Sequence, residues 1–457
     1  MGKTDSNEYY SKILGVDVNS IETVSPLNEI SVDPNVHRSK VFSRVVKYKD
    51  GNTSSLLYKV MPKPEYKNAN HHEEIVLSFA YDLAKKTPNI HYSIPKLLDH
   101  IIDERTLVME YVEGDSLAKR IQTLDKRVDE IEHELKVNSK SSKEKGILWG
   151  KLNAINEIKK SFIKLGLRGL AEFQYFSRNN LGGLKEALSD KKLRLYNPLE
   201  HDSKDHYKDK IIGNLTELLN ECKISYDKKI LLESILNKDP LGKIPINPLV
   251  EEINNYDKDR IIISDYHPLH IIPVHNNEIN SMISELVSIN NLEKYDEENA
   301  DLLIKRIEKE GSIIITDLGD VRIGHELFDF VDLTRNHTFA LRPNEVDELL
   351  QYFLRERQYL RSEDVGDKYA KYHDMFIMID AYRALRATVK TKEDWEKIFY
   401  LDHLVDDLSY HSELKPLSNV ILSYISSAIG SIQSRIDEKN GIKNNPTALK
   451  ALKATSI

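Results

Sequence analysis

The sequence of 457 residues lacks disulfide-forming cysteines and long apolar segments. Its single cysteine, Cys222, cannot form an internal disulfide or supply a thiolate zinc cluster. No run approaches the roughly 18 apolar residues of a transmembrane helix, and the first ten residues, MGKTDSNEYY, contain no apolar signal core. We therefore expect a cytoplasmic protein without a membrane partner.

The sequence also contains little glycine and proline, and its net charge is not positive. The 18 glycines and 15 prolines exclude a collagen-like or low-complexity chain. The formal net charge is −8, so no global basic field attracts nucleic acid, and we expect no nucleic-acid partner. With 40% hydrophobic and 30% charged residues, the composition is typical of a globular protein with one or more sizeable cores.

The first part of the chain predicts a small antiparallel sheet and one helix. Strands are expected at NEISV, VFSRVVKY and SSLLYKVM within residues 28–61, with a hairpin turn at Asp50-Gly51. Helical spacing of apolar residues follows over 71–86, and two more strands are expected at IPKLLDHII and RTLVMEYV. Residues 1–112 are therefore predicted to form an N-terminal lobe.

The remaining residues, 113–457, predict a larger and mainly helical lobe. Two long helices are expected from Leu117 to about 176, separated by a polar turn at 138–146. Short strands are expected at RIIIS, HIIPV and SIIITDLG, and helical insertions at about 178–258 and 278–310. Helices continue from Pro343. The predicted fold class is therefore α+β.

Two charged residues in the N-terminal lobe are candidates for a site. Lys59 lies in the apolar strand LLYKVM on the same face as Leu57 and Met61, so its ammonium needs an anionic partner if that face is buried. Taken alone, such a lysine is typical of an edge strand. Glu73 or Glu74, at the start of the following helix, could reach back to it, although acidic residues in a first turn commonly face solvent.

Two loops that follow apolar strands also carry carboxylates. Asp265 lies in SDYHPLHI at 264–271, and Asp317 lies in TDLGDVRIG at 316–324. Catalytic groups are often held in loops at the ends of buried strands. One carboxylate could orient a nucleophile and the other could hold a divalent cation.

In their order, these segments resemble the protein-kinase-like fold, specifically its aminoglycoside phosphotransferase and choline kinase branch. LVMEYVEGDSL resembles the hinge between the two lobes, SDYHPLHI the catalytic loop, and TDLGDVRIGHELFDF the metal loop. The second aspartate of that loop, Asp329, follows Asp317 by 12 residues, as in the family. The resemblance covers both lobes except the insertions, and it implies a bilobal fold.

The resemblance also implies ATP and Mg²⁺ (or Mn²⁺) as cofactors and a role for each matching residue. Lys59 would neutralise the α and β phosphates, and Glu73 would fix its ammonium. Leu57 would lie against the adenine, and the hinge backbone at Glu110, Tyr111 and Val112 would bind the adenine edge. The catalytic base would be Asp265, the metal ligands Asp317 and His270, and the brace of the catalytic loop Asp329.

Some positions depart from the family pattern. The loop expected to cover the phosphates, DPNVHRSK, contains no glycine. His270 stands where the family has a metal-binding asparagine, which weakens a Mg²⁺ site or favours a softer ion such as Mn²⁺. His71-His72-Glu73-Glu74 could suggest another metal site, but without further suitably spaced ligands we expect ordinary polar residues there.

Two functions remain open from the sequence. The first is an ATP-dependent phosphotransferase that moves the γ-phosphoryl group to a hydroxyl of a small-molecule acceptor. The alternative is a pseudokinase-like scaffold that binds nucleotide or nothing and contacts a protein partner through its insertions. The sequence identifies neither the acceptor nor the oligomeric state. Four acidic residues are candidates for contact with a cationic acceptor: Glu326, Asp380, Asp406 and Asp407.

Overall fold

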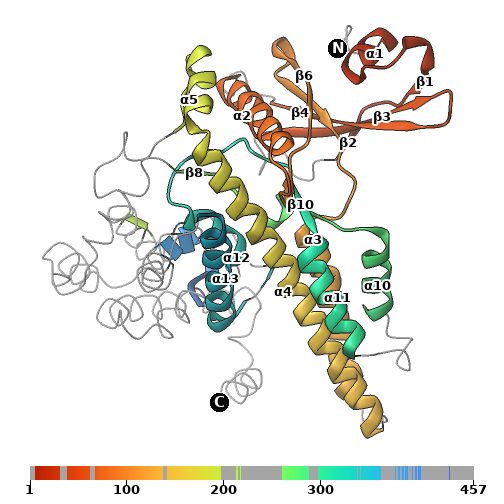
Figure 1. Cartoon of the computed structure of the whole chain (residues 1–457), viewed down its shortest axis with the longest axis vertical. Coiled ribbons are helices and arrows are strands. Elements are labelled where there is room, and N and C mark those ends of the chain that lie inside the picture. The colour runs from red at the N-terminus through yellow and green to blue at the C-terminus, as the bar shows by residue number, and fades with distance from the viewer. Residues whose placement is uncertain are drawn as a thin grey trace, which may run out of the picture. The chain divides into compact units, whose positions relative to one another are not determined.

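A computed structural model describes residues 6–30, 39–61, 67–136, 141–196, 260–287, 297–336, 338–339 and 341–361, with isolated positions between 213 and 432 (Figure 1). The chain forms two compact units. The first is Met1–Tyr196 with Ile261–Arg322, and the second is Asn197–Arg260 with Ile323–Ile457. The division into lobes at residue 112 stays a prediction. None of the described helices is long and apolar enough to cross a membrane.

The first unit begins with an antiparallel sheet in the strand order β1-β3-β4-β7-β6, with β2 also paired to β3. The Asp50-Gly51 hairpin is confirmed, and Gly51 supplies the positive φ, 87°, that the turn needs. Strand β1 was not predicted, because its four residues are too few to show an alternating pattern. The strand bounds are β1 (Ile21–Val24), β2 (Asn28–Glu29), β3 (Lys40–Tyr48), β4 (Thr53–Val60), β6 (Leu97–Ile101) and β7 (Thr106–Glu110).

Strand β4, which carries Lys59, lies in the interior of this sheet. Lys59 is in register with Val41 on β3 and with Leu107 on β7. The expectation of an edge-strand lysine is therefore wrong. The strand pattern of the sequence does not reveal that β7, almost fifty residues downstream, pairs with the free side of β4.

The two faces of β4 have different environments. Leu56 and Tyr58 pack with Tyr10 of helix α1 (Asn7–Leu14) in an apolar cluster. Because successive strand residues point to opposite faces, Leu57 and Lys59 lie on the other face. Helix α2 (Lys67–Lys86), which includes the predicted 71–86 segment, packs against β6 and β7.

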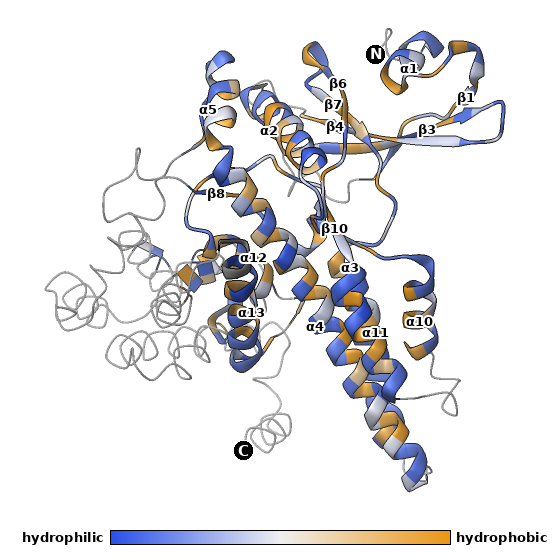
Figure 2. Cartoon of the chain, viewed as in Figure 1, coloured by the Kyte–Doolittle hydropathy of each residue, from blue (hydrophilic) through white to orange (hydrophobic). Residues whose placement is uncertain are grey.

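Long helices support the loops of the first unit. Helix α3 (Leu117–Lys136) and helix α4 (Ser142–Asn179) form the predicted helical pair and lie side by side in Figure 1. Ser141 and Glu144 form a capping box that fixes the start of α4. Helix α11 (Glu297–Glu310) packs on α4. Each of these helices carries both hydrophobic and hydrophilic residues, as expected for helices with one buried side (Figure 2).

A second, smaller sheet has the order β5 (Tyr92–Ser93), β10 (Ser312–Ile315), β9 (Ile271–Val274). Strands β9 and β10 are antiparallel neighbours, and helices α10 (Asn277–Val287) and α11 lie between them in sequence. The predicted 278–310 insertion is therefore the long connection of a β-hairpin. Strand β8 (Ile261–Ile262) lies in the predicted segment RIIIS, whereas β11 (Arg322–Ile323) was not predicted and lies in the segment expected to be a loop.

The second unit contains helices α12 (Leu327–Thr334) and α13 (Pro343–Arg361). The ring of Phe330 lies 5.4 Å from that of Phe353 and 5.7 Å from that of Phe376, which forms an aromatic core. The short helix α5 (Leu181–Asp190), in the first unit, corresponds to the first residues of the predicted 178–258 insertion. Most of that insertion and of the helices predicted after residue 361 lies outside the described residues.

Candidate active site

Lys59 contacts two carboxylates that come from distant parts of the sequence. Its Nζ lies 2.6 Å from Glu73 Oε1 on α2 and 3.1 Å from Asp317 Oδ1 in the loop after β10. Lys59 is 7% exposed and Glu73 is fully buried. The sheet face opposite the α1 cluster thus ends in a buried ammonium that two carboxylates share.

The three groups shift one another's protonation. Burial disfavours the ammonium of Lys59, but the charges of Asp317 and Glu73 outweigh it and raise the lysine pKa. Burial raises the pKa of Glu73 to about 7 against the opposing charge of Lys59. Burial also acts to raise the pKa of Asp317, but Lys59, His270 and the Gly319 N–H together lower it to about 2. Asp317 is therefore ionised at neutral pH.

Gly319 leaves room for the carboxylates of Asp317 and Glu73, which both lie beside it. Its N–H donates to Asp317 Oδ1 at 3.0 Å. A Cβ on residue 319 would lie 3.3 Å from both Asp317 Oδ1 and Glu73 Oε2, closer than most Cβ contacts. The sequence suggested only a turn glycine, whereas the structure places it between the two carboxylates.

The pairing of β9 with β10 brings the two predicted loops together. Ile315 of β10 is in register with Ile271 of β9, so Asp317 follows the end of one strand while His270 precedes the other. Thr316 fixes this junction, because its N–H and its Oγ1 both donate to the carbonyl of His270, at 2.9 and 3.2 Å. Asp265 and Asp317, which are 52 positions apart, are thus brought together by one hairpin.

The loop that contains Asp265 is anchored by its neighbours. Tyr266 is fully buried, and its hydroxyl donates to the carbonyl of Gly166 on α4 at 2.7 Å. Ser264 adopts a left-handed conformation with φ of 70°. The Asp265 side chain is 55% exposed, and its Oδ2 lies 3.8 Å from His270 Nδ1. A rigid loop therefore presents an accessible carboxylate.

Two donor atoms remain available beside Lys59. Asp317 makes its hydrogen bonds through Oδ1, and its Oδ2 makes none with the described residues. His270 Nδ1 faces the carbonyl of Asp265 at 3.3 Å, while Nε2 makes no hydrogen bond in the described part of the chain. A carboxylate oxygen and an imidazole nitrogen are a donor set that suits Mn²⁺ or Zn²⁺ better than Mg²⁺.

The residues expected to hold a nucleotide base lie on β4 and at the end of β7, at Glu110, Tyr111 and Val112. Leu57 is half-buried on the Lys59 face of β4. The N–H groups of Glu110 and Tyr111 donate to the carbonyls of Lys96 and Ser55, at 2.9 and 3.0 Å. In the described part of the chain, Val112 N–H has no acceptor, so it is the hinge donor open to a ligand.

Asp329 lies in the second unit, so its contact with the catalytic loop stays a prediction. It is fully buried in α12, so it does not form an exposed ion pair at the surface. Glu326 is also buried and pairs with Arg260 and Arg357, and Asp380 pairs with Arg335 at 3.6 Å. These internal arginine contacts make Glu326 and Asp380 poor candidates for binding a cationic acceptor. Asp406 and Asp407 lie outside the described residues.

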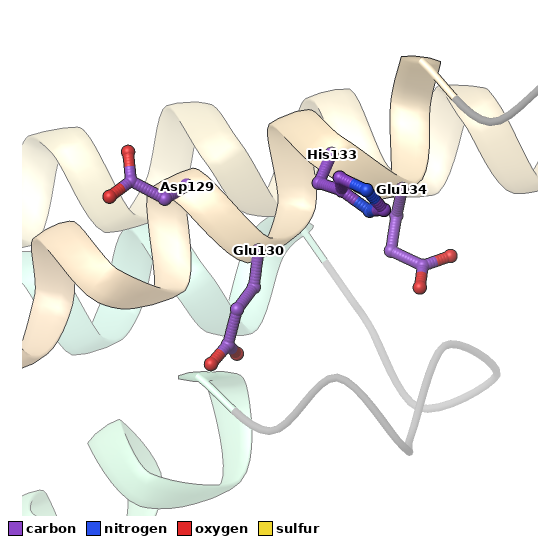
Figure 3. A pocket seen from close by; sticks show the side chains of 4 residues that line it. All are labelled: Asp129, Glu130, His133 and Glu134. Carbon is purple, nitrogen blue, oxygen red and sulfur yellow. The ribbon is translucent and has the colours of Figure 1, made fainter.

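A separate hollow of about 450 Å³ lies beside α3, away from the residues named above. It is lined by Asp129, Glu130, His133 and Glu134, whose side chains point in different directions (Figure 3). Glu130 is paired with Arg127. The hollow contains no group of three converging ligand atoms among the described residues.

Sequence reasoning missed Thr316 and Tyr266, which fix the two loops, and it undervalued Gly319. Thr316 directly precedes Asp317 and Tyr266 directly follows Asp265. Adjacency to a candidate carboxylate was the one signal for them, because their partners, His270 and Gly166, are set by tertiary packing.

No protein-family model matches the sequence, and no curated protein matches it. Three solved structures are similar to the chain. A type I macrolide 2'-phosphotransferase has 11% identity and a TM-score of 0.38, with 94% of this chain and 97% of that chain covered. An ethanolamine kinase of Plasmodium vivax has 12% identity and a TM-score of 0.37, with coverage of 83% and 82%.

The third, a macrolide 2'-phosphotransferase apoenzyme of Brachybacterium faecium, has 10% identity and a TM-score of 0.38, with coverage of 84% and 92%. The antiparallel sheet of this chain, its helix with Glu73 and its mainly helical remainder fit the α+β kinase-like fold expected from the sequence.

Proposed function

We propose that the protein is an ATP-dependent phosphotransferase that moves the γ-phosphoryl group to a hydroxyl of a small molecule. The observation that carries this proposal is the contact of Lys59 with both Glu73 and Asp317, beside the loop of Asp265 and His270. Phosphoryl transfer needs positive charge and positioning more than covalent help from protein groups. This arrangement offers a fixed ammonium, a cation ligand and an accessible carboxylate.

The charge balance of the site supports binding of a metal-bound nucleotide. The single positive charge of Lys59 is shared by the carboxylates of Asp317 and Glu73, so the cluster without a metal does not favour a triphosphate. Asp317 Oδ2 and His270 Nε2 would hold a divalent cation, which would supply the missing positive charge to the phosphates. The residues present therefore fit a metal–ATP complex, with Mn²⁺ preferred over Mg²⁺ because of the nitrogen ligand.

Each of the other residues has a role of its own in this proposal. Lys59 binds phosphate oxygens, and Glu73 holds its ammonium in place. Val112 N–H donates to the base, and Leu57 packs against it. Asp265 accepts the proton of the acceptor hydroxyl or orients it, and its exposure leaves room for a small molecule. Asp329 braces the catalytic loop.

The test is an assay of the purified full chain with ATP, Mg²⁺ or Mn²⁺ and a panel of small molecules with hydroxyl groups. The wild-type protein is expected to form a phosphorylated product or to hydrolyse ATP slowly. Asp265→Asn should lose at least about 100-fold in rate while it still binds nucleotide. Asp301→Asn, an exposed change on α11, is the matched control and should keep full activity.

A second function, a nucleotide-binding scaffold, is favoured by His270 at the expected asparagine position. In that case the unfolding temperature would rise on addition of nucleotide and metal, because a ligand that binds the native state stabilises it. The Asp265→Asn variant would then be indistinguishable from wild type in every assay. Absence of turnover with both metals, together with a nucleotide shift, would replace the first proposal with the second.

A further inference from the structure

A second group of potential ligands lies on the same helix as Glu73. His71 and Glu74 are three residues apart on α2, and His100 lies on the neighbouring strand β6. One ligand atom from each lies within 4.8 Å of the other two. No other group of three histidine, cysteine or acidic ligands converges in this way among the described residues. The sequence expectation of ordinary polar residues here rested on the apparent lack of a third ligand, and His100 supplies it.

The three side chains meet at one carboxylate oxygen. Glu74 Oε2 lies 2.5 Å from His100 Nδ1 and 3.3 Å from His71 Nδ1. The two imidazole rings are 4.8 Å apart and nearly perpendicular, at 76°, so they do not stack. Two ring nitrogens and one carboxylate thus point to a common position.

Asn70 orients the ring of His100. The Asn70 amide nitrogen donates to the carbonyl of Arg105 at 3.3 Å, so its amide oxygen is the atom turned toward His100. That oxygen accepts a hydrogen bond from His100 Nε2. His100 Nδ1 is thereby turned toward the carboxylate of Glu74, at 2.5 Å from Oε2. A ring nitrogen and a carboxylate oxygen this close are joined either by a hydrogen bond or by a metal ion.

We propose that His71, Glu74 and His100 bind a divalent transition-metal ion of the Zn²⁺ class. Two imidazoles and one carboxylate are a common ligand set for zinc, with a water molecule as the fourth ligand. The hydrogen bond from His100 Nε2–H to Asn70 is the outer contact that orients ligating histidines in proteins. His71 and Glu74 are 20% and 28% exposed at their side chains, which gives the ion a path from solvent.

This site is distinct from the Lys59 cluster but is coupled to it through α2. Glu73 and Glu74 are consecutive, and they face different partners: Lys59 and His100. A metal ion bound to Glu74 and His100 ties the N-terminal half of α2 to β6. The ion would thereby restrict the movement of the helix that brings Glu73 to Lys59. The metal site does not depend on the proposed phosphotransferase activity.

The experiment measures Zn²⁺ binding to the chelator-stripped full chain by calorimetry and follows Co²⁺ binding by its visible absorption. One tight site is expected, with the intense absorption of Co²⁺ in a four-coordinate environment. The variants His71→Gln and Glu74→Gln should lose binding at least about 100-fold, and Asn70→Ser should lose about 10- to 100-fold. His133→Gln, an exposed histidine among carboxylates on α3, should bind as the wild type does.

The location of the ion is tested by His270→Gln, which removes the nitrogen donor beside Asp317 and should leave this binding unchanged. Circular dichroism of each stripped variant shows whether it is folded, and the partly exposed His71→Gln is the variant least expected to disturb folding. The proposal is overturned if the stripped wild-type chain binds no stoichiometric Zn²⁺, in which case a hydrogen bond alone joins His100 to Glu74. It is also overturned if folded His71→Gln binds Zn²⁺ as tightly as the wild-type protein.

Discussion

At the scale of single residues, the candidate active site depends on Lys59. A lysine in an apolar strand has two explanations in a sequence, an edge position or a buried ion pair. The structure shows a buried ion pair, because β4 has a neighbouring strand on each side and Glu73 is fully buried beside the ammonium of Lys59. The candidate residues and their types could be predicted from sequence. Their convergence could not, because Lys59 and Asp317 are 258 positions apart.

Replacement of Lys59 by methionine should destabilise the protein. The change leaves Glu73 and Asp317 without their shared counter-ion, and removal of one partner of a buried ion pair costs about 3–5 kcal/mol. Urea unfolding should show a loss of about 3 kcal/mol, partly restored in the double variant Lys59→Met/Glu73→Gln. Lys47→Met on neighbouring β3, whose lysine is exposed and paired with Glu22, should change stability by less than about 1 kcal/mol. Equal losses in the two single variants would contradict this account.

Asp317 should contribute to the acid stability of the protein. Its pKa in the folded state, about 2, is below its ordinary value of 3.8, so its contribution is fully present above pH 3.8 and is lost as pH falls toward 2. The contribution has an upper bound of about 2 kcal/mol, which solvent screening reduces because the side chain is one-third exposed. Urea unfolding at several pH values should show a weaker loss of stability over pH 4 to 2 in Asp317→Asn than in wild type. If the loss of stability between pH 4 and pH 2 is the same in Asp317→Asn as in wild type, Asp317 makes no such contribution.

At the scale of elements, register determines which loops meet. The sequence predicted the strands HIIPV and SIIITDLG and the helical segment between them. It did not show that the strands pair in a hairpin, because alternation within a strand carries no information about its partner. The same limit applies to β4 and β7. Short elements such as α1 and β1 were missed because few residues give too weak a periodic signal.

The contact between α4 and β10 should be sensitive to one added methyl group. A Cβ on Gly169 of α4 would clash with the buried side chain of Ile313, so in Gly169→Ala either that side chain or the helix must shift from its position beside the strand that leads to Asp317. Overpacking of this kind costs about 1–3 kcal/mol. Gly146→Ala in the same helix meets nothing within 4 Å and should stabilise it by up to about 1 kcal/mol. The unfolding temperature should therefore fall in Gly169→Ala and rise in Gly146→Ala. A lower unfolding temperature in Gly146→Ala would contradict this account of the two glycines.

At the scale of the whole molecule, the order of strand and helix patterns predicted the α+β class, and the net charge predicted the absence of a basic surface field. The candidate site residues Lys59, Glu73, Asp265, His270 and Asp317 all lie in the first compact unit. The boundaries of the units differ from the predicted lobes, because contacts between distant segments define a unit, and a sequence shows only neighbours along the chain.

The net charge of −8 disfavours binding of an anionic nucleotide unless a cation binds with it. Neither the surface field nor the cluster around Lys59 provides excess positive charge, so ATP should bind only with a divalent cation. In thermal unfolding, ATP with EDTA should give no shift, whereas ATP with Mn²⁺ should give a larger shift than ATP with Mg²⁺. His270→Asn replaces the nitrogen donor by an oxygen donor and should reverse the order of the two metals. A full ATP shift in EDTA would show that positive charge from the protein alone holds the phosphates, and an unchanged order in His270→Asn would exclude His270 as a metal ligand.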